Sequence, residues 1–257
     1  MIRSLLILML FGALPARADA VADQLTVAGI AEFTAAYQAW DGARFAAAAE
    51  LFRQAGANAS ASVTNFYWLG VAEFHRMLQL QNPPAGPTNP PPAGVARDAA
   101  VDALTTAVKL DGHHAESHAL LGTLYGMKIN DSVLRAGWYG PRVAQHQNQA
   151  IEFGAANPRV QYLLGLCRFH TAKQPAAWQE TLATLLAADK LFEVEARVAA
   201  APLEPRWGHD SCLTFIGRTY EKLGQPAKAA DYFRRALEKH PQDCMAQAGL
   251  ERVTKRK

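Results

Sequence analysis

The chain has 257 residues, of which 50% are hydrophobic and 19% are charged. This apolar content can build a buried core, so an intrinsically disordered chain is excluded. The formal charge of +3 comes from 26 basic and 23 acidic residues, a balance too even for a nucleic-acid binder, which usually carries a concentrated basic face. No apolar run reaches the ~18 residues of a membrane-spanning helix, so the mature chain is not expected to insert into a membrane.

Residues 1–20 have the features of a secretory signal peptide. Arg3 precedes an apolar stretch from Leu5 to Leu14, and Pro15 and an alanine-rich segment follow it. A positive start, a short apolar core and an A-x-A ending are typical of exported proteins, and we expect cleavage after Ala18 or Ala20. The mature chain is therefore predicted to be periplasmic or secreted, of bacterial type.

The middle of the chain contains an internal repetition of helical segments. The first segment carries Phe45, Ala48 and Phe52 at helical spacing. Further along, two stretches match each other in order, Tyr67-Trp-Leu-Gly70-Val-Ala-Glu-Phe74-His75 and Tyr162-Leu-Leu-Gly165-Leu-Cys-Arg-Phe169-His170. The match predicts a duplicated pair of helical units, and both stretches are expected to lie on the first helix of a unit.

Insertions separate the helical segments. The proline-rich stretch 82–92 predicts an extended, exposed loop, and 130–142 predicts a turn-rich loop. Residues 176–201 predict one long helix. The aromatic residues Trp138, Tyr139 and Trp207 are predicted to fill gaps between helical units.

The C-terminal segment carries the clearest motif. It contains the pattern Leu213-x2-Ile216-Gly217-x2-Tyr220, then Gly224, Ala229-x3-Phe233, Ala236 and Pro241. This pattern resembles the tetratricopeptide repeat (TPR), a helix–turn–helix unit of about 34 residues. Its small residues allow two helices to approach closely, its aromatic residues fill the space beside them, and the proline ends the second helix.

The resemblance implies an all-α fold: a right-handed α-solenoid of about five TPR-like helix hairpins, with loop insertions and a C-terminal capping helix. The expected boundaries are a signal peptide at 1–20 and a solenoid at 21–257, with repeats at 29–62, 63–114, 115–157, 158–209 and 210–243 and a cap at 244–257.

Motifs of catalysis are absent from the sequence: it has no G-x-S-x-G, H-E-x-x-H, P-loop or dinucleotide fingerprint. Cys167 lies three residues before His170, but its place beside Gly165 predicts a buried structural thiol. We therefore expect a protein that is not an enzyme and that needs no cofactor.

Two alternatives concern metal and disulfide chemistry. His113, His114, Glu116 and His118 lie together at a repeat junction, so an alternative function is a periplasmic protein that binds a metal or small ligand there. Cys212 and Cys244 fall near the starts of neighbouring helices, where either a disulfide or two free thiols can be expected.

The resemblance also implies a binding surface. In TPR proteins the first helices of successive repeats line a concave groove that holds a protein or peptide partner. Phe74 and Phe169 are expected to belong to the core. Carried over by position, the predicted partner-binding residues are Tyr67, His75, Tyr162, His170 and Arg218. The groove is expected to take an apolar or mixed ligand.

Overall fold

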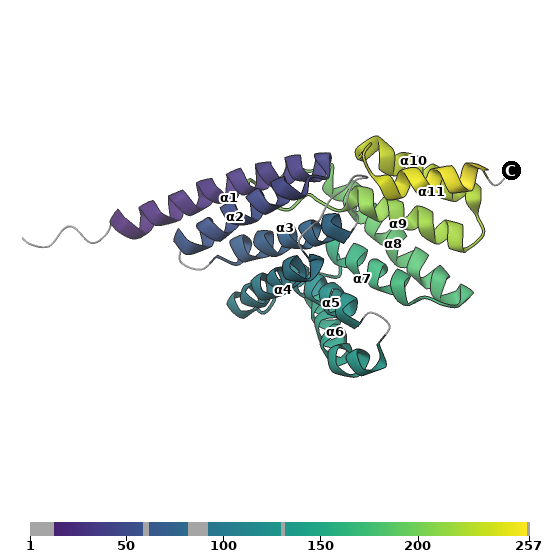
Figure 1. Cartoon of the computed structure of the whole chain (residues 1–257), viewed down its shortest axis with the longest axis horizontal. Coiled ribbons are helices and arrows are strands. Elements are labelled where there is room, and N and C mark those ends of the chain that lie inside the picture. The colour runs from purple at the N-terminus through teal and green to yellow at the C-terminus, as the bar shows by residue number, and fades with distance from the viewer. Residues whose placement is uncertain (1–12, 59–61, 82–91, 130–131, 256–257) are drawn as a thin grey trace, which may run out of the picture. The chain divides into compact units, whose positions relative to one another are not determined.

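The computed structural model describes residues 13–58, 62–81, 92–129 and 132–255, and within them all regular secondary structure is helical (Figure 1). The helices are α1 (Ala13–Ala39), α2 (Gly42–Asn58), α3 (Val63–Gln81), α4 (Ala93–Leu110), α5 (Ala115–Ile129), α6 (Val133–Gly154), α7 (Pro158–Thr171), α8 (Pro175–Glu195), α9 (His209–Lys222), α10 (Pro226–Lys239) and α11 (Cys244–Lys255). The predicted all-α class, with consecutive hairpins followed by a capping helix, is confirmed. None of the helices in the described part of the chain is long and apolar enough to cross a membrane.

The chain divides into two compact units, one formed by residues 1–37 and 41–106 and the other by residues 38–40 and 107–257. In the first unit α2 packs against α3, and in the second unit α5 packs against α6, α7 against α8, and α10 against both α9 and α11. The exact repeat boundaries expected from the sequence stay a prediction.

Two predicted segments fall mainly outside the described residues. The apolar part of the signal peptide up to residue 12 lies there, as does nearly all of the proline-rich loop. On α1 the described buried positions begin at Ala22 and continue through Thr26, Phe33 and Ala36. This spacing is that of one helix face.

The first unit has an aromatic core. Phe33 of α1 packs against Phe45 of α2 and Trp68 of α3, with ring centroids 5.8 and 5.4 Å away. Phe52 stacks on Trp68 at 5.9 Å, and all four rings are buried. Between α3 and α4, a Cβ placed on Gly70 would come within 2.5 Å of Leu104, so glycine permits the close approach of these two helices.

The helix pairs of the second unit also have glycines where two helices approach closely. A Cβ on Gly165 of α7 would come within 2.5 Å of Leu185 on α8. The ring of Phe233 on α10 fills the space between Gly217 of α9 and Gly249 of α11, where added Cβ atoms would lie 2.8 and 2.4 Å from it. The roles predicted for the small and aromatic residues of the C-terminal motif therefore match this packing.

The loop predicted at 130–142 is wrong for most of its length, because α6 begins at Val133 and contains Pro141. The Ser132 hydroxyl accepts a hydrogen bond from the backbone N–H of Arg135 and caps the helix. Trp207 is buried as expected, but Trp138 is exposed and fills no gap. Tyr139 stacks on Tyr125 of α5 instead, with 5.9 Å between ring centroids.

The long helix predicted at 176–201 is shorter in the structure, since α8 ends at Glu195. The chain then runs through turns to Gly208, whose φ of +97° favours glycine, and α9 follows. Cys212 and Cys244 are both free thiols; the first is buried, and its Sγ lies 3.5 Å from the carbonyl oxygen of Leu185.

Candidate functional site

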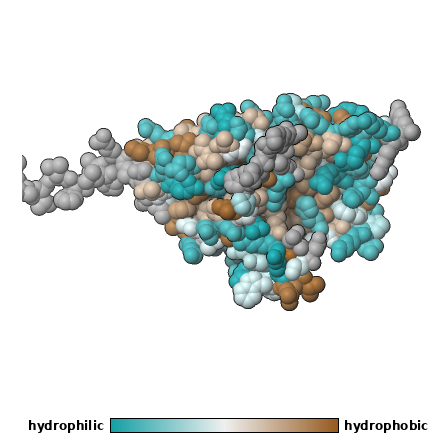
Figure 2. Space-filling model, in the orientation of Figure 1, coloured by the Kyte–Doolittle hydropathy of each residue, from teal (hydrophilic) through white to brown (hydrophobic). Residues whose placement is uncertain are grey.

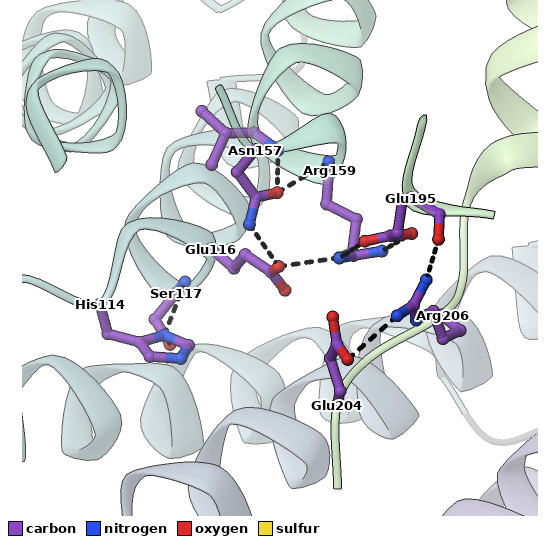
Figure 3. Close-up of polar contacts among 9 residues, drawn as sticks. His114, Glu116, Ser117, Asn157, Arg159, Glu195, Glu204 and Arg206 are labelled. Atoms are coloured by element: carbon purple, nitrogen blue, oxygen red, sulfur yellow. Dashed lines mark hydrogen bonds and ion pairs between the residues drawn. The ribbon is translucent and has the colours of Figure 1, made fainter. Parts of the chain in front are cut away.

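A buried ionic network fixes the start of α7 (Figure 3). The side chain of Asn157 caps the helix, accepting hydrogen bonds from the backbone N–H groups of Arg159 and Val160 at 2.9 and 3.2 Å. The buried guanidinium of Arg159 then bridges Glu116 of α5, at 2.8 Å, and Glu195 of α8, at 3.0 Å. The network therefore ties α5, α7 and α8 together from inside the second unit.

The side chains of the histidine-rich junction, which the alternative function assigns to a metal or small ligand, have contacts within the protein. Glu116 turns toward Arg159 and Asn157, while His114 turns toward Ser117, 2.8 Å from its hydroxyl (Figure 3). His118 points to the Gly112 carbonyl oxygen at 2.9 Å. In the part of the chain that the structure describes, no group of three or more His, Cys, Asp or Glu side chains is placed to hold a metal ion. The side chains of His114, Glu116 and His118 instead contact Ser117, Arg159 and the Gly112 carbonyl oxygen.

A surface with a different character lies across α7 and α9. The guanidinium carbon of Arg218 lies 4.7 Å from the ring centroid of Phe169 and 4.9 Å from that of Phe215. Its Nη1 is 3.7 Å from the sulfur of Met245, on α11. The cation is therefore half-buried on two aromatic faces, an arrangement that holds an arginine in place by cation–π attraction.

Among the described residues, no carboxylate lies within ion-pair distance of Arg218. The nearest acidic side chains are already engaged: Glu221 pairs with Arg252 at 3.0 Å, and Asp243 accepts from Thr214 at 2.6 Å and caps α11. Burial, aided by the charge of Arg252, lowers the pKa of Arg218. Glu221 and Asp243 offset this effect only in part, because both carboxylates act on the guanidinium from beyond ion-pair distance.

Three further side chains complete this surface. His170 is exposed, with its ring centroid 6.0 Å from that of Phe215; partial burial and the charge of Arg218 lower its pKa. Trp178 packs edge-on against Phe169 at 5.2 Å, and Lys222 lies 5.9 Å from the Trp178 ring. We name the accessible residues of this region the α7–α9 surface: His170, Trp178, Arg218, Lys222 and Met245.

One family model matches a segment of the chain that contains two residues of this surface. The family model described as tetratricopeptide repeat matches residues 211–243, which include Arg218 and Lys222. This segment is similar to a tetratricopeptide repeat. No curated protein matches the sequence.

Solved structures extend the TPR fold over most of the chain. A thermophilic TPR protein of Thermus thermophilus has 15% sequence identity and a TM-score of 0.60, over 88% of this chain and 98% of that chain. The APC/C hetero-tetramer Cut9–Hcn1 has 16% identity and a TM-score of 0.58, over 95% of this chain and 41% of that chain. At these identities the likeness shows the fold alone, and that fold is the TPR fold.

Three of the residues predicted to line the TPR groove are not at the surface. Tyr67, His75 and Tyr162 are all buried, which corrects the expectation that their polar ends face a partner. The ring of His75 packs against Phe33 and Tyr37, at 5.1 and 5.2 Å. Its Nδ1 lies 2.8 Å from the carbonyl oxygen of Val71, so its polar atom has a partner within its own helix.

Tyr162 is enclosed in the second unit. Its ring centroid lies 6.5 Å from that of Phe215, and burial raises its pKa. The core roles predicted for Phe74 and Phe169 are confirmed by their burial. Of the five predicted partner-binding residues, only His170 and Arg218 are accessible, and the structure brings these two together.

Sequence reasoning missed Phe215, Trp178 and Met245. Phe215 precedes Arg218 by three positions on one helix, a spacing that places side chains on the same face and could have signalled the pair. Trp178 and Met245 come from α8 and α11, and no local pattern in the sequence links them to the TPR motif of α9 and α10.

Proposed function

We propose that this protein is an exported, non-enzymatic TPR scaffold that binds a protein or peptide partner through the α7–α9 surface. The observation that carries the proposal is Arg218, a half-buried cation on two aromatic rings with no carboxylate on it among the described residues. TPR solenoids use the surfaces formed by their stacked helices to hold other polypeptides.

The chemistry of the surface favours a segment that combines an acidic group with an apolar side chain. A partner carboxylate can pair with Arg218 in a setting where water is already partly displaced, which strengthens a charge-assisted hydrogen bond. Trp178 and Met245 offer apolar contact area beside it, and aromatic and arginine side chains dominate the energetics of many interfaces. The scaffold then acts by complementarity, without a chemical step.

A peptide selection tests this proposal. Random peptides displayed on phage are selected against the full chain, and the best are synthesised and titrated by fluorescence anisotropy. We expect selected peptides to be enriched in Asp or Glu beside an apolar residue. Arg218→Ala should raise their Kd at least about tenfold, because loss of a charge-assisted pair at a partly desolvated site costs more than ~1.4 kcal/mol.

A matched arginine provides the control. Arg234 is exposed on α10 and pairs with Asp231 at 2.8 Å, so Arg234→Ala removes the same charge from a different face. Circular dichroism and Tm measurements establish that both variants are folded. Selected peptides that bind Arg218→Ala and Arg234→Ala equally well would refute the assignment of the partner site.

Export is supported by the N-terminal sequence, with its positive start, short apolar core and A-x-A ending. We propose that cleavage occurs after Ala18 or Ala20. Mass spectrometry of protein recovered from the periplasmic fraction of a bacterial host should give an N-terminus at Asp19 or Val21. A chain that stays in the cytoplasm with Met1 in place would contradict export.

A further inference from the structure

The outer end of the α5–α6 hairpin exposes a small apolar cluster. In the first turns of α6, Val133, Leu134 and Trp138 have 86%, 88% and 66% of their surface accessible. In the space-filling view, strongly apolar atoms gather at the end of this hairpin (Figure 2). Large apolar side chains this exposed are costly in water, so a clustered set of them indicates a contact surface.

The cluster has an ordered arrangement along the helix. Leu134, Trp138 and Arg142 follow one another at four-residue spacing, so they lie along one face over about 12 Å at ~1.5 Å per residue. The guanidinium of Arg142 lies 5.1 Å from the Trp138 ring centroid and donates a hydrogen bond to the Trp138 carbonyl oxygen at 3.1 Å. An aliphatic residue therefore comes first, an aromatic residue next and a cation last.

Basic side chains lie close to the aromatic residues of this cluster. Lys128 and Arg142 lie 5.8 and 6.0 Å from the ring centroid of Tyr139. Arg135 is exposed nearby. The described residues 125–129 and 132–142 contain these three basic side chains and no acidic one; Asp131, between the helices, lies outside the described residues.

We infer that this end of the hairpin docks onto an anionic lipid bilayer surface. Aliphatic side chains favour the acyl region, tryptophan and tyrosine favour the interface, and lysine and arginine favour the phosphate level, which is the order of Leu134, Trp138 and Arg142. The basic side chains complement anionic headgroups. This inference goes beyond the proposed partner binding, because it uses none of the residues of the α7–α9 surface.

The exposed side chains of the α6 tip are separate from those that pack it on α5. Val133, Leu134 and Trp138 are largely exposed, whereas Tyr139 stacks on Tyr125 of α5. The three exposed side chains can therefore enter a lipid interface while α6 stays packed on α5. A shallow insertion of this kind anchors a protein reversibly.

Vesicle co-sedimentation tests the inference with the full chain. The probes are vesicles of equal parts phosphatidylglycerol and phosphatidylcholine, and vesicles of phosphatidylcholine alone. We expect binding to the anionic vesicles that weakens as salt rises. Leu134→Ala/Trp138→Ala should lower the partition coefficient at least about tenfold, since each large apolar side chain removed from water contributes about that factor.

Two control variants separate the tip from general effects. Val194→Ala/Val198→Ala removes two exposed apolar side chains elsewhere in the second unit, and Arg234→Ala removes an exposed cation from α10. Both should bind anionic vesicles like the unsubstituted chain, whereas Arg135→Ala/Arg142→Ala should bind them weakly. Every variant keeps the same N-terminus, so any contribution of residues 1–20 is equal in all of them.

Three outcomes would overturn the inference. One is no binding of the unsubstituted chain to anionic vesicles, and another is an equal loss in the tip and control variants. The third is self-association, measured by sedimentation velocity, that depends on Leu134 and Trp138, together with vesicle binding that does not depend on these residues. This result would show that the cluster binds a second copy of the chain. Peptide binding at Arg218 is unaffected by these results, so the two proposals fail independently.

Discussion

The Nδ1 atoms of His118 and His146 lie 2.8 Å apart between α5 and α6. Nε2 of His118 lies 2.9 Å from the carbonyl oxygen of Gly112, so we assign its proton to Nε2. Nδ1 of neutral His118 then accepts the proton that Nδ1 of His146 donates. Protonation of both rings would place two donors face to face, so the contact requires at least one neutral imidazole.

The pair makes stability depend on pH. Burial, followed by the proximity of His118, lowers the pKa of His146 to about 4, while an unfolded histidine titrates near 6.5. Between these values the unfolded chain binds a proton that the folded chain does not. The contribution of neutral His146 to the free energy of unfolding is therefore complete above pH ~6.5 and is lost as the pH falls toward 4.

Two measurements check this prediction. An NMR titration should show the His146 ring protonating near pH 4 in the folded chain. Urea unfolding should show that His146→Gln loses less stability than the unsubstituted chain between pH 7 and pH 4.5. Identical pH profiles for the two proteins would contradict the assignment.

Arg159→Met should be strongly destabilising. It leaves the carboxylates of Glu116 and Glu195 without their shared cation in a buried setting, and removal of one partner from such a network costs about 3–5 kcal/mol. Arg234→Ala breaks an exposed pair and should change the unfolding free energy by less than ~1 kcal/mol. Urea unfolding of both variants measures the difference; similar small losses would mean that the network is not a structural support.

Alanine substitution at two glycines of neighbouring helix pairs should change the stability of the protein in opposite directions. Gly165→Ala forces the new Cβ against Leu185, which is fully buried and has no room to move, so a loss of about 1–3 kcal/mol is expected. Gly126 has nothing within 4 Å of an added Cβ, and alanine there should raise stability by up to ~1 kcal/mol through helix propensity. Thermal unfolding of the two variants distinguishes packing from propensity.

Trp207 and Trp138, two of the tryptophans of the second unit, provide another contrast. Trp207→Ala removes a buried ring and should cost about 3–5 kcal/mol. Trp138→Ala removes an exposed ring and should leave the unfolding free energy within ~0.5 kcal/mol. Chemical denaturation measures both, and a large loss for Trp138→Ala would place this ring in a contact that the fold does not show.

The helical architecture could be predicted because its cause is local. Gly165 and Gly217 mark close helix approaches, and Phe233 fills the space between two such glycines, so motif and packing coincide. The first helices of the hairpins were also recognisable, since Tyr67 and Tyr162 lie in matching stretches on α3 and α7.

Exposure at these helices could not be predicted in the same way. His75 and His170 occupy matching positions, yet Phe33, Tyr37 and Phe45 surround the first while the second is at the surface. The difference comes from what the neighbouring helices contribute, which a single helix pattern does not contain. Glycine and proline in α6 likewise favoured a loop, but packing against α5 overrides that propensity.

The three cysteines have very different surroundings, and this has a practical consequence. Burial raises the pKa of Cys167 and Cys212, which slows alkylation, whereas Cys244 is exposed. Cys244 also precedes Met245, whose sulfur touches the Arg218 side chain. A maleimide dye added to the native chain should therefore label this one thiol first and report, by its change in brightness, when a ligand arrives next to it.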